Sequence, residues 1–191
     1  DRDILVVNKR AGMAMYETYN HHGNALSNAV AAAGFDGPFR PIYRLDKDTS
    51  GLVVLARHQL SAAKLAGKVQ KDYYAVVPGP YTGSGTVDAP IAHCPDSTVK
   101  RCVDPAGVRA VTHWEALGQQ GGRTLLRVQL ETGRTHQIRV HFAHLGTPLV
   151  GDSLYGTAPI STRHLLHCKT IRLMHPVREE PVAFDCPFPS D

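Results

Sequence analysis

Two carboxylates, Asp46 and Asp48, stand in the segment 43–51, which reads YRLDKDTSG and directly precedes a short apolar run. Acidic residues that alternate before a glycine resemble the opening of a calcium-binding loop, in which their oxygens would surround the ion. Such a loop needs a bidentate Glu six residues after Gly51, but Arg57 occupies that place. A strand also follows where a calcium loop would lead into a helix. The segment therefore does not predict calcium binding.

Two interpretations of the same segment stay open. Residues 48–51 are Asp, Thr, Ser and Gly, all of which favour an ordinary turn. A turn alone does not account for Arg44 and Asp46. The functional interpretation places the Asp46 carboxylate on a loop at the edge of a strand, where a rigid scaffold often presents catalytic groups.

A second polar segment, 130–141 (LETGRTHQIRVH), runs from a strand through a glycine turn into a helix. The unpaired N–H groups and the dipole of a helix start favour an anion there, and Thr135 is the expected N-cap. The segment lacks the second glycine and the Gly-Lys-Ser/Thr ending of a phosphate-binding P-loop. The other interpretation is that Arg139 and the histidines form a polar helix face, which applies most to His136 and His144.

The cysteines and histidines do not predict a metal site. The four cysteines are far apart and form no C-x-x-C pair, so neither a zinc site nor a disulfide framework is expected. They are Cys94, Cys102, Cys168 and Cys186, and we expect them to be reduced and mostly buried. His141 and His144 lie three residues apart on a predicted helix, but no His-Glu-x-x-His motif supports metal binding.

Composition places the chain among globular proteins. It has 191 residues, a formal net charge of +4 and a sequence pI of about 9.0. Its length fits one domain, and its apolar runs are far shorter than the ~18 residues that span a bilayer. Transmembrane, small secreted and fibrous classes are therefore excluded. Residues 97–150 hold seven Lys or Arg against three Asp or Glu, which predicts either a solvated basic face or an anionic partner, nucleic acid first.

The elements that must position the two polar segments are mostly strands. Apolar and β-branched runs predict strands over 4–8, 51–57, 72–77, 108–117, 124–131, 169–174 and 181–184. Helices are predicted over 25–33 with Asn24 as the N-cap, over 59–66, and within 133–144 before Gly146. The two strands 108–117 and 124–131 are expected to form a hairpin across residues 118–122. These elements predict a single α+β domain over residues 1–191, a mixed and mainly antiparallel sheet with flanking helices.

Three motifs, in this order, make the sequence similar to a known family. They are Arg44-Leu45-Asp46-x-x-Thr49-Ser50-Gly51, Lys71-x-Tyr73-x-Ala75 and the stretch 132–141. Shorter matches are Val6-Val7-Asn8-Lys9, Ala110-x-Thr112, Gly151-Asp152-x-x-Tyr155-Gly156, Leu166-His167 and His175-Pro176. Over nearly its whole length the chain resembles the RluA family of RNA pseudouridine synthases. It departs from the family in Tyr43, where a His is common, and in a shorter stretch before Lys71.

The resemblance implies the catalytic-domain fold of that family, without a separate N-terminal RNA-binding module. It also implies that the chain isomerises a uridine in ribosomal or transfer RNA without a metal or organic cofactor. Asp46 would start glycosidic cleavage, by attack on the sugar or by removal of a proton. Arg139 would keep Asp46 ionised, because a neighbouring Arg lowers the pKa of a carboxyl group. Tyr73 would pack on the target base and is the candidate to accept the proton that leaves carbon 5.

The resemblance implies further contacts with the RNA. Arg44 is expected to fill the space that the flipped uridine leaves, or to hold that nucleotide. The substrate-binding candidates at the start of the helix are Arg134, Thr135, His136 and Gln137. The expected partner is RNA and not a membrane, and we expect a cytoplasmic monomer.

Two other functions are weighed against this one. A catalytically silent RNA-binding protein of the same fold would need the basic surface but no carboxylate at Asp46. A cofactor-free nucleoside or glycoside hydrolase would normally need a second catalytic carboxylate. Asp48 is the only nearby candidate for that second role, and building the turn is the role that its type favours.

Overall fold

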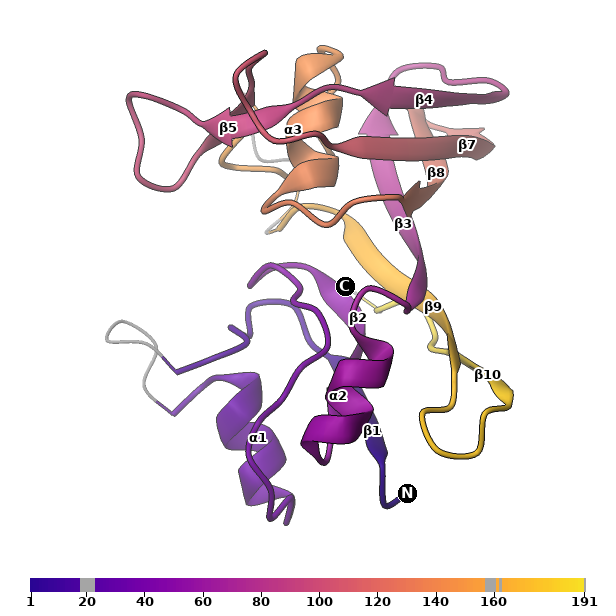
Figure 1. The fold of residues 1–191 in the computed structure, drawn as a ribbon. Helices are drawn as coiled ribbons and strands as arrows, with labels where there is room; N and C mark the ends of the chain where they lie inside the picture. Colours follow the sequence, from indigo (N-terminus) through magenta and orange to yellow (C-terminus); the bar gives the residue numbers. More distant parts are fainter. Residues whose placement is uncertain (18–22, 157–160, 162, 191) are drawn as a thin grey trace. The chain divides into compact units, whose positions relative to one another are not determined.

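The computed structural model describes residues 1–191 except 18–22, 157–160, 162 and 191 (Figure 1). The chain divides into two compact units, which are described one at a time. The first consists of Asp1–Lys71 and His167–Asp191, and the second of Asp72–Leu166. The first unit therefore contains both ends of the chain, and the sequence offered no linker that would mark this division. The single domain over residues 1–191 stays a prediction.

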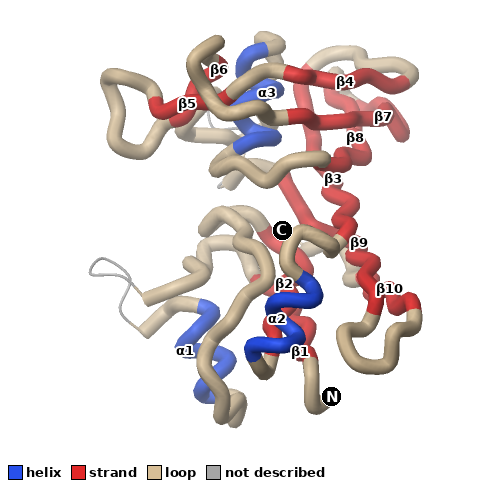
Figure 2. Tube along the Cα trace, in the orientation of Figure 1, coloured by secondary structure: helices blue, strands red, loops and turns tan. Residues whose placement is uncertain are grey.

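The first unit is built on a buried central strand. β2 (Ser50–Ala56) is buried along all seven residues, as its continuous apolar sequence predicts. It pairs antiparallel with β1 (Ile4–Lys9) and parallel with the start of β9 (Leu166–Met174). β10 (Pro181–Asp185) adds to β9 in antiparallel register. The unit also contains the short helices α1 (Leu26–Ala32) and α2 (Gln59–Leu65), and Figure 2 shows long loops between its elements.

The N-cap that the sequence predicted for α1 is wrong. Ala25, not Asn24, occupies the N-cap position, and the Asn28 side chain accepts a hydrogen bond from the Ala25 N–H at 3.1 Å. Asn24 is an exposed residue before the cap. An asparagine three residues inside the helix thus satisfies the backbone donor that a capping-box Glu or Gln usually satisfies.

The second unit is mainly an antiparallel sheet. Its strands are β3 (Gln70–Pro78), β8 (Arg123–Leu130), β7 (Val111–Gln120) and β4 (Ser84–Asp88), which are neighbours in this order. The short strands β5 (Ile91–His93) and β6 (Arg101–Val103) form a separate two-stranded sheet. α3 (Gln137–His144) contacts β6 and β7 (Figure 1). The predicted α+β class with a mixed, mainly antiparallel sheet is confirmed.

The hairpin of β7 and β8 has a tighter turn than the predicted loop over 118–122. Gln120 pairs with Arg123, so only Gly121 and Gly122 connect the strands. Both have positive φ, 58° and 72°, which is the conformation of a type I′ hairpin turn. The register shifts between Ala116 and Gly118, and Leu117, which was predicted as the last residue of the strand, is the extra residue of this bulge.

Among the described residues, no helix is both long and apolar enough to cross a membrane.

Candidate functional site

Asp46 lies in the first unit, on the long loop that leads into β2. The Thr49 N–H donates to the Asp46 carbonyl at 3.1 Å, which closes a turn over residues 46–49. The neighbours Leu45 and Thr49 are buried, whereas Asp46 itself is half-buried and Arg44 is exposed. A turn is therefore present, but it covers 46–49 and not the predicted 48–51, because Ser50 and Gly51 already belong to β2. The same turn leaves the Asp46 side chain at the border between the interior and solvent.

Hydrogen bonds from the buried ammonium group of Lys9 stabilise this turn. Lys9, at the end of β1, is 1% exposed. Its Nζ donates to the carbonyl oxygens of Arg10, Met13 and Lys47 at 3.0, 2.8 and 2.9 Å. Three acceptors match the three N–H groups of an ammonium, and these hydrogen bonds offset the free-energy cost of burying its charge. Lys47 follows Asp46 directly, so Lys9 fixes the backbone beside the candidate catalytic carboxylate.

The end of the loop, where β2 begins, is fixed by contacts with β9. Ser50 Oγ lies 2.9 Å from His167 Nδ1, and both side chains are buried. Gly51 has a φ of 118°, and a Cβ there would lie 2.2 Å from the Cys168 carbonyl oxygen. Only glycine fits such a close approach of two backbones. A cavity of about 470 Å³ opens beside these contacts, and Lys9, Ser50 and His167 are among its lining residues.

Tyr73 lies in the second unit, on β3. Its side chain is 6% exposed and it pairs with Val128, whereas Tyr74 is half-buried and pairs with Arg127. Successive side chains of a strand point to opposite faces, so the structure separates the two tyrosines as the alternation predicts.

The start of α3 differs from the predicted one. His136, not Thr135, is the N-cap residue, and no side-chain hydrogen bond caps the helix. His136 has a φ of 57°, a left-handed conformation that costs a non-glycine residue roughly 1–3 kcal/mol. Its Nδ1 lies 2.8 Å from the Tyr155 hydroxyl, which holds it in this conformation. Thr135 is exposed. The prediction failed because a residue nineteen positions away, and not the local cap preference, decides the conformation.

Gln137 has an internal role in the structure. The side chain is 2% exposed and makes four hydrogen bonds. Its Oε1 accepts from Thr132 Oγ1 and the Arg134 N–H, at 2.8 and 3.0 Å. Its Nε2 donates to the Val111 carbonyl and Thr112 Oγ1, at 2.9 and 3.0 Å. These bonds use both donors of the amide and two acceptor sites, so Gln137 positions the turn before α3, and its contact with RNA stays a prediction.

Arg139 is buried in a two-point ion pair. Its Nε and Nη2 donate to the two Asp152 carboxylate oxygens at 2.7 and 2.9 Å. Its guanidinium also lies 5.1 Å from the centre of the Tyr155 ring. Burial alone would raise the pKa of Asp152, but the hydrogen bonds and charge of Arg139 outweigh it, so this pKa is lowered. Asp152 is therefore an anion that fixes the plane of the guanidinium.

Sequence reasoning did not assign a role to Asp152 and Tyr155. Both stand in Gly151-Asp152-x-x-Tyr155-Gly156, a short match that was the one signal for them. Arg139 and Tyr73 belong to the second unit, whereas Asp46 belongs to the first. The three catalytic candidates therefore come from two units, and the pairing of Arg139 with Asp46 stays a prediction.

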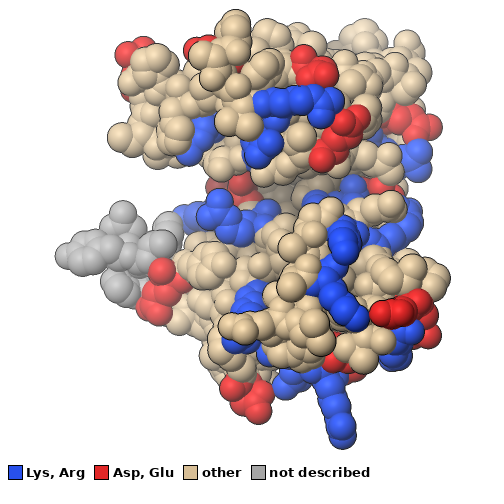
Figure 3. All heavy atoms as spheres, in the orientation of Figure 1, with Lys and Arg blue, Asp and Glu red and all other residues tan. Residues whose placement is uncertain are grey.

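The basic side chains of the segment 97–150 are partly neutralised by carboxylates of the second unit. Arg127 pairs with Glu115 on the neighbouring strand, and Arg109 lies 3.4 Å from Glu131 and 3.6 Å from Asp88. Figure 3 accordingly shows acidic side chains beside basic ones on the face that it draws. Arg134 is exposed, and its Nε donates to the Arg109 carbonyl at 3.0 Å.

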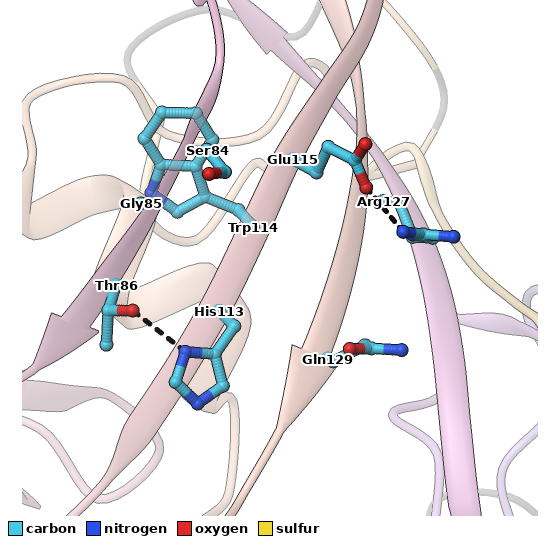
Figure 4. Close-up of a pocket in the computed structure, with 8 residues that line it drawn as sticks. All are labelled: Ser84, Gly85, Thr86, His113, Trp114, Glu115, Arg127 and Gln129. Carbon is cyan, nitrogen blue, oxygen red and sulfur yellow. Dashed lines mark hydrogen bonds and ion pairs between the residues drawn. The ribbon is translucent and has the colours of Figure 1, made fainter.

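A shallow hollow of about 260 Å³ lies on the sheet of the second unit, away from these candidates (Figure 4). It is lined by residues of β4, β7 and β8, and none of the predicted site residues is among them. Two pairs of its lining side chains bond to each other, Thr86 with His113 and Glu115 with Arg127. Arg127 pairs with Tyr74, so the hollow lies on the face opposite to Tyr73.

Comparisons with known proteins place the chain in one family. The family model described as RNA pseudouridylate synthase matches residues 3–144. An uncharacterized RNA pseudouridine synthase of Bacillus subtilis is 39% identical, over 100% of this chain and 71% of its own length. The ribosomal large subunit pseudouridine synthase D of Escherichia coli is 36% identical, over 100% of this chain and 66% of its own length. The chain thus spans about two thirds of the length of these relatives.

A solved structure agrees with the sequence comparisons. The human RNA pseudouridylate synthase domain containing 1 has a TM-score of 0.81 and 26% identity, and the match covers 98% of this chain and 80% of that one. The resemblance that the sequence motifs indicated is therefore confirmed. The chain belongs to the RluA-type RNA pseudouridine synthases, a family of isomerases.

Proposed function

We propose that this chain converts a specific uridine of ribosomal or transfer RNA into pseudouridine, with Asp46 as the catalytic carboxylate. The observation that carries the proposal is the fixed turn around Asp46. Lys9 bonds the carbonyl of Lys47 on one side, and the Ser50–His167 contact holds the other. A half-buried carboxylate on a loop fixed at both ends is preorganised to meet one carbon or one proton of a bound ribose.

The proposed reaction separates uracil from its ribose and rejoins it through carbon 5. Asp46 starts the cleavage as an anion, either by bonding to the sugar or by taking a proton from it. Arg139 supports this anion in the proposed mechanism. In the structure, Asp152 accepts hydrogen bonds from two of the five N–H groups of this guanidinium. Asp152 would then act through Arg139 as a positioning residue.

Tyr73 is proposed to pack against the target base. It is an aromatic side chain on a strand whose neighbours fix it, so it offers a flat surface at little cost in side-chain entropy. Its hydroxyl is the candidate acceptor for the proton that leaves carbon 5. Tyr73→Phe keeps the ring and removes the hydroxyl, so full activity of that variant would remove the proton-transfer role.

The exposed side chains near these groups are the proposed RNA contacts. Arg44 precedes Asp46 by two residues and is exposed, as filling a vacated base position requires. Arg134 and Thr135 are exposed before α3 and are proposed to contact the RNA backbone, with His136 beside them. Several relatives are named for the large ribosomal subunit, and this favours ribosomal RNA as the first substrate to test. We propose a monomer that works in the cytoplasm.

Release of tritium from carbon 5 of labelled uridine in RNA tests the proposal. The wild type should release tritium without free uracil, and Asp46→Asn should release none. Asp48→Asn is a matched control, because it removes a carboxylate from the same turn and should leave most of the activity. Free uracil would identify a hydrolase instead, and RNA binding without either product would identify a silent binder.

A further inference from the structure

Two cysteines face each other across the β5–β6 hairpin. Ala92 pairs with Cys102, His93 pairs with Arg101, and the Cys94 N–H donates to the Lys100 carbonyl at 3.2 Å. Residues two apart on a strand share a face, so Cys94 and Cys102 are diagonal neighbours on one face of the ladder. Both are half-exposed, whereas the other two cysteines of the chain are buried. The prediction of mostly buried cysteines therefore holds for only one pair.

The two thiol groups are neighbours on this face. The Cys102 thiol hydrogen-bonds with the Cys94 sulfur, and this bond, followed by partial desolvation and the nearby Asp104, raises the pKa of Cys102 to about 11. Cys102 consequently keeps its proton at neutral pH. Because the thiolate is the nucleophile, this raised pKa disfavours Cys102 as the sulfur that attacks first.

We propose that Cys94 and Cys102 form a site of reversible oxidation, at which a peroxide converts the two thiols into an intramolecular disulfide. The Cys94 thiol loses its proton and its sulfur attacks one peroxide oxygen. The O–O bond breaks, a sulfenic acid forms on Cys94, and the leaving hydroxide takes up the released proton to give water. The Cys102 sulfur then attacks Cys94 Sγ, its proton goes to the departing hydroxyl, and water leaves. Two thiols and one hydrogen peroxide thus give one disulfide and two waters.

The geometry makes this disulfide a labile one. Diagonal neighbours in an antiparallel ladder are about 7–8 Å apart, whereas the Cα atoms of a disulfide are about 4.4–6.8 Å apart. The hairpin must therefore tighten when the bond forms. Strained and accessible disulfides are reduced more readily than structural ones, which is what a reversible modification requires.

Tightening of the hairpin acts on the groups around Arg139. The Arg101 N–H, beside Cys102, donates to the Tyr155 hydroxyl at 3.0 Å. The same hydroxyl lies 2.8 Å from His136 Nδ1, and the Tyr155 ring lies beneath the Arg139 guanidinium. Oxidation should weaken the Arg101–Tyr155 bond and, if the proposed function holds, slow turnover.

Mass spectrometry of the intact protein tests the site directly. After treatment with hydrogen peroxide and alkylation, the wild type should lose two hydrogens and give a peptide pair linked through Cys94 and Cys102. Dithiothreitol should restore both thiols. Cys102→Ser should instead carry its oxidation on Cys94 alone, as a sulfenic acid and then higher oxides. Independent oxidation of both residues in the wild type, or links between two molecules only, would overturn the proposal.

Hydrogen exchange tests the coupling without relying on catalysis. The Arg101 amide should exchange several-fold faster in the oxidised wild type than in the reduced one, and peroxide should not change its exchange in the Cys94→Ser/Cys102→Ser variant. Equal exchange in both redox states would refute the link to Tyr155. A protein that forms the disulfide but releases no tritium in either state would refute the proposed function and leave the oxidation site standing.

Discussion

Replacement of Asp152 by alanine tests the buried ion pair on which the candidate site depends. The Asp152 carboxylate accepts four hydrogen bonds, two from Arg139 and one each from the N–H groups of Leu154 and Tyr155. The side chains of Arg139 and Asp152 are only 8% and 0% exposed. Removing one partner of such a pair costs about 3–5 kcal/mol, because the remaining charge stays buried without its counter-ion.

Urea and thermal unfolding measure this loss. For a chain of this size, about 3–5 kcal/mol corresponds to a fall in Tm of roughly 6–20 °C. Asp152→Asn keeps an acceptor oxygen but not the charge, so it should fall between the wild type and Asp152→Ala. The double variant Arg139→Met/Asp152→Ala should cost less than the sum of its two single changes, since it leaves no unpaired charge. A cost below about 1 kcal/mol for Asp152→Ala would match an exposed pair and refute the reasoning.

The pH dependence of stability gives an independent readout of the same pair. The pKa of Asp152 is lowered in the folded state, so folding favours its ionised form. This contribution is fully present above the unfolded pKa of about 3.9 and is lost as pH falls through the lower folded value. The wild type should therefore lose stability more steeply than Asp152→Asn below about pH 4.

Three further changes test other parts of the structure. Lys9→Met should lower the Tm and reduce kcat more than it raises KM, because three carbonyls lose their donor and the turn that carries Asp46 loosens. Gly51→Ala should prevent stable folding, since its Cβ would lie 2.2 Å from a carbonyl oxygen of β9, whereas Gly118→Ala, in open space, should unfold close to the wild-type temperature. Burial lowers the pKa of His141, so the neutral imidazole stabilises the folded state fully above about pH 6.5 and less as pH falls below that value. In His141→Gln, the urea midpoint should therefore vary less between about pH 5 and about pH 7 than it does in the wild type.

The parts of the fold that depend on local pattern were predictable. The apolar run of β2, the Tyr- and Val-rich β3 and the hairpin of β7 and β8 were all expected as strands, and the structure has them within a few residues. A turn before β2 was predicted from residue types as well, but over 48–51, two residues later than the turn observed at 46–49. In each case the side-chain period or the turn preference is a property of neighbouring residues.

The errors arose where a distant residue decides a local conformation. Thr135 has the right side chain for an N-cap, but the Tyr155 hydroxyl holds His136 in the left-handed conformation and moves the start of α3 beyond both. The bonds of the Gln137 amide to the carbonyl and hydroxyl groups at the start of β7 were likewise not visible in the sequence, whereas its RNA contact stays a prediction. A sequence pattern indicates which residue types favour a role, but it does not show which distant residues will contact them in the folded protein.

The charge of the basic segment 97–150 was also overestimated from the sequence, because ion pairs formed by the fold cannot be counted along the chain. Its excess of Lys and Arg was counted along the chain, but Arg127 and Glu115 are twelve residues apart and directly opposite in the β7–β8 register. Arg109 and Arg139 also have carboxylate partners within the second unit. A phosphate backbone therefore meets a smaller basic surface than the sequence count indicates. Since net charge supplies affinity but little discrimination, recognition of one uridine should depend more on the fixed loops that present Arg44 and Arg134 than on bulk electrostatics.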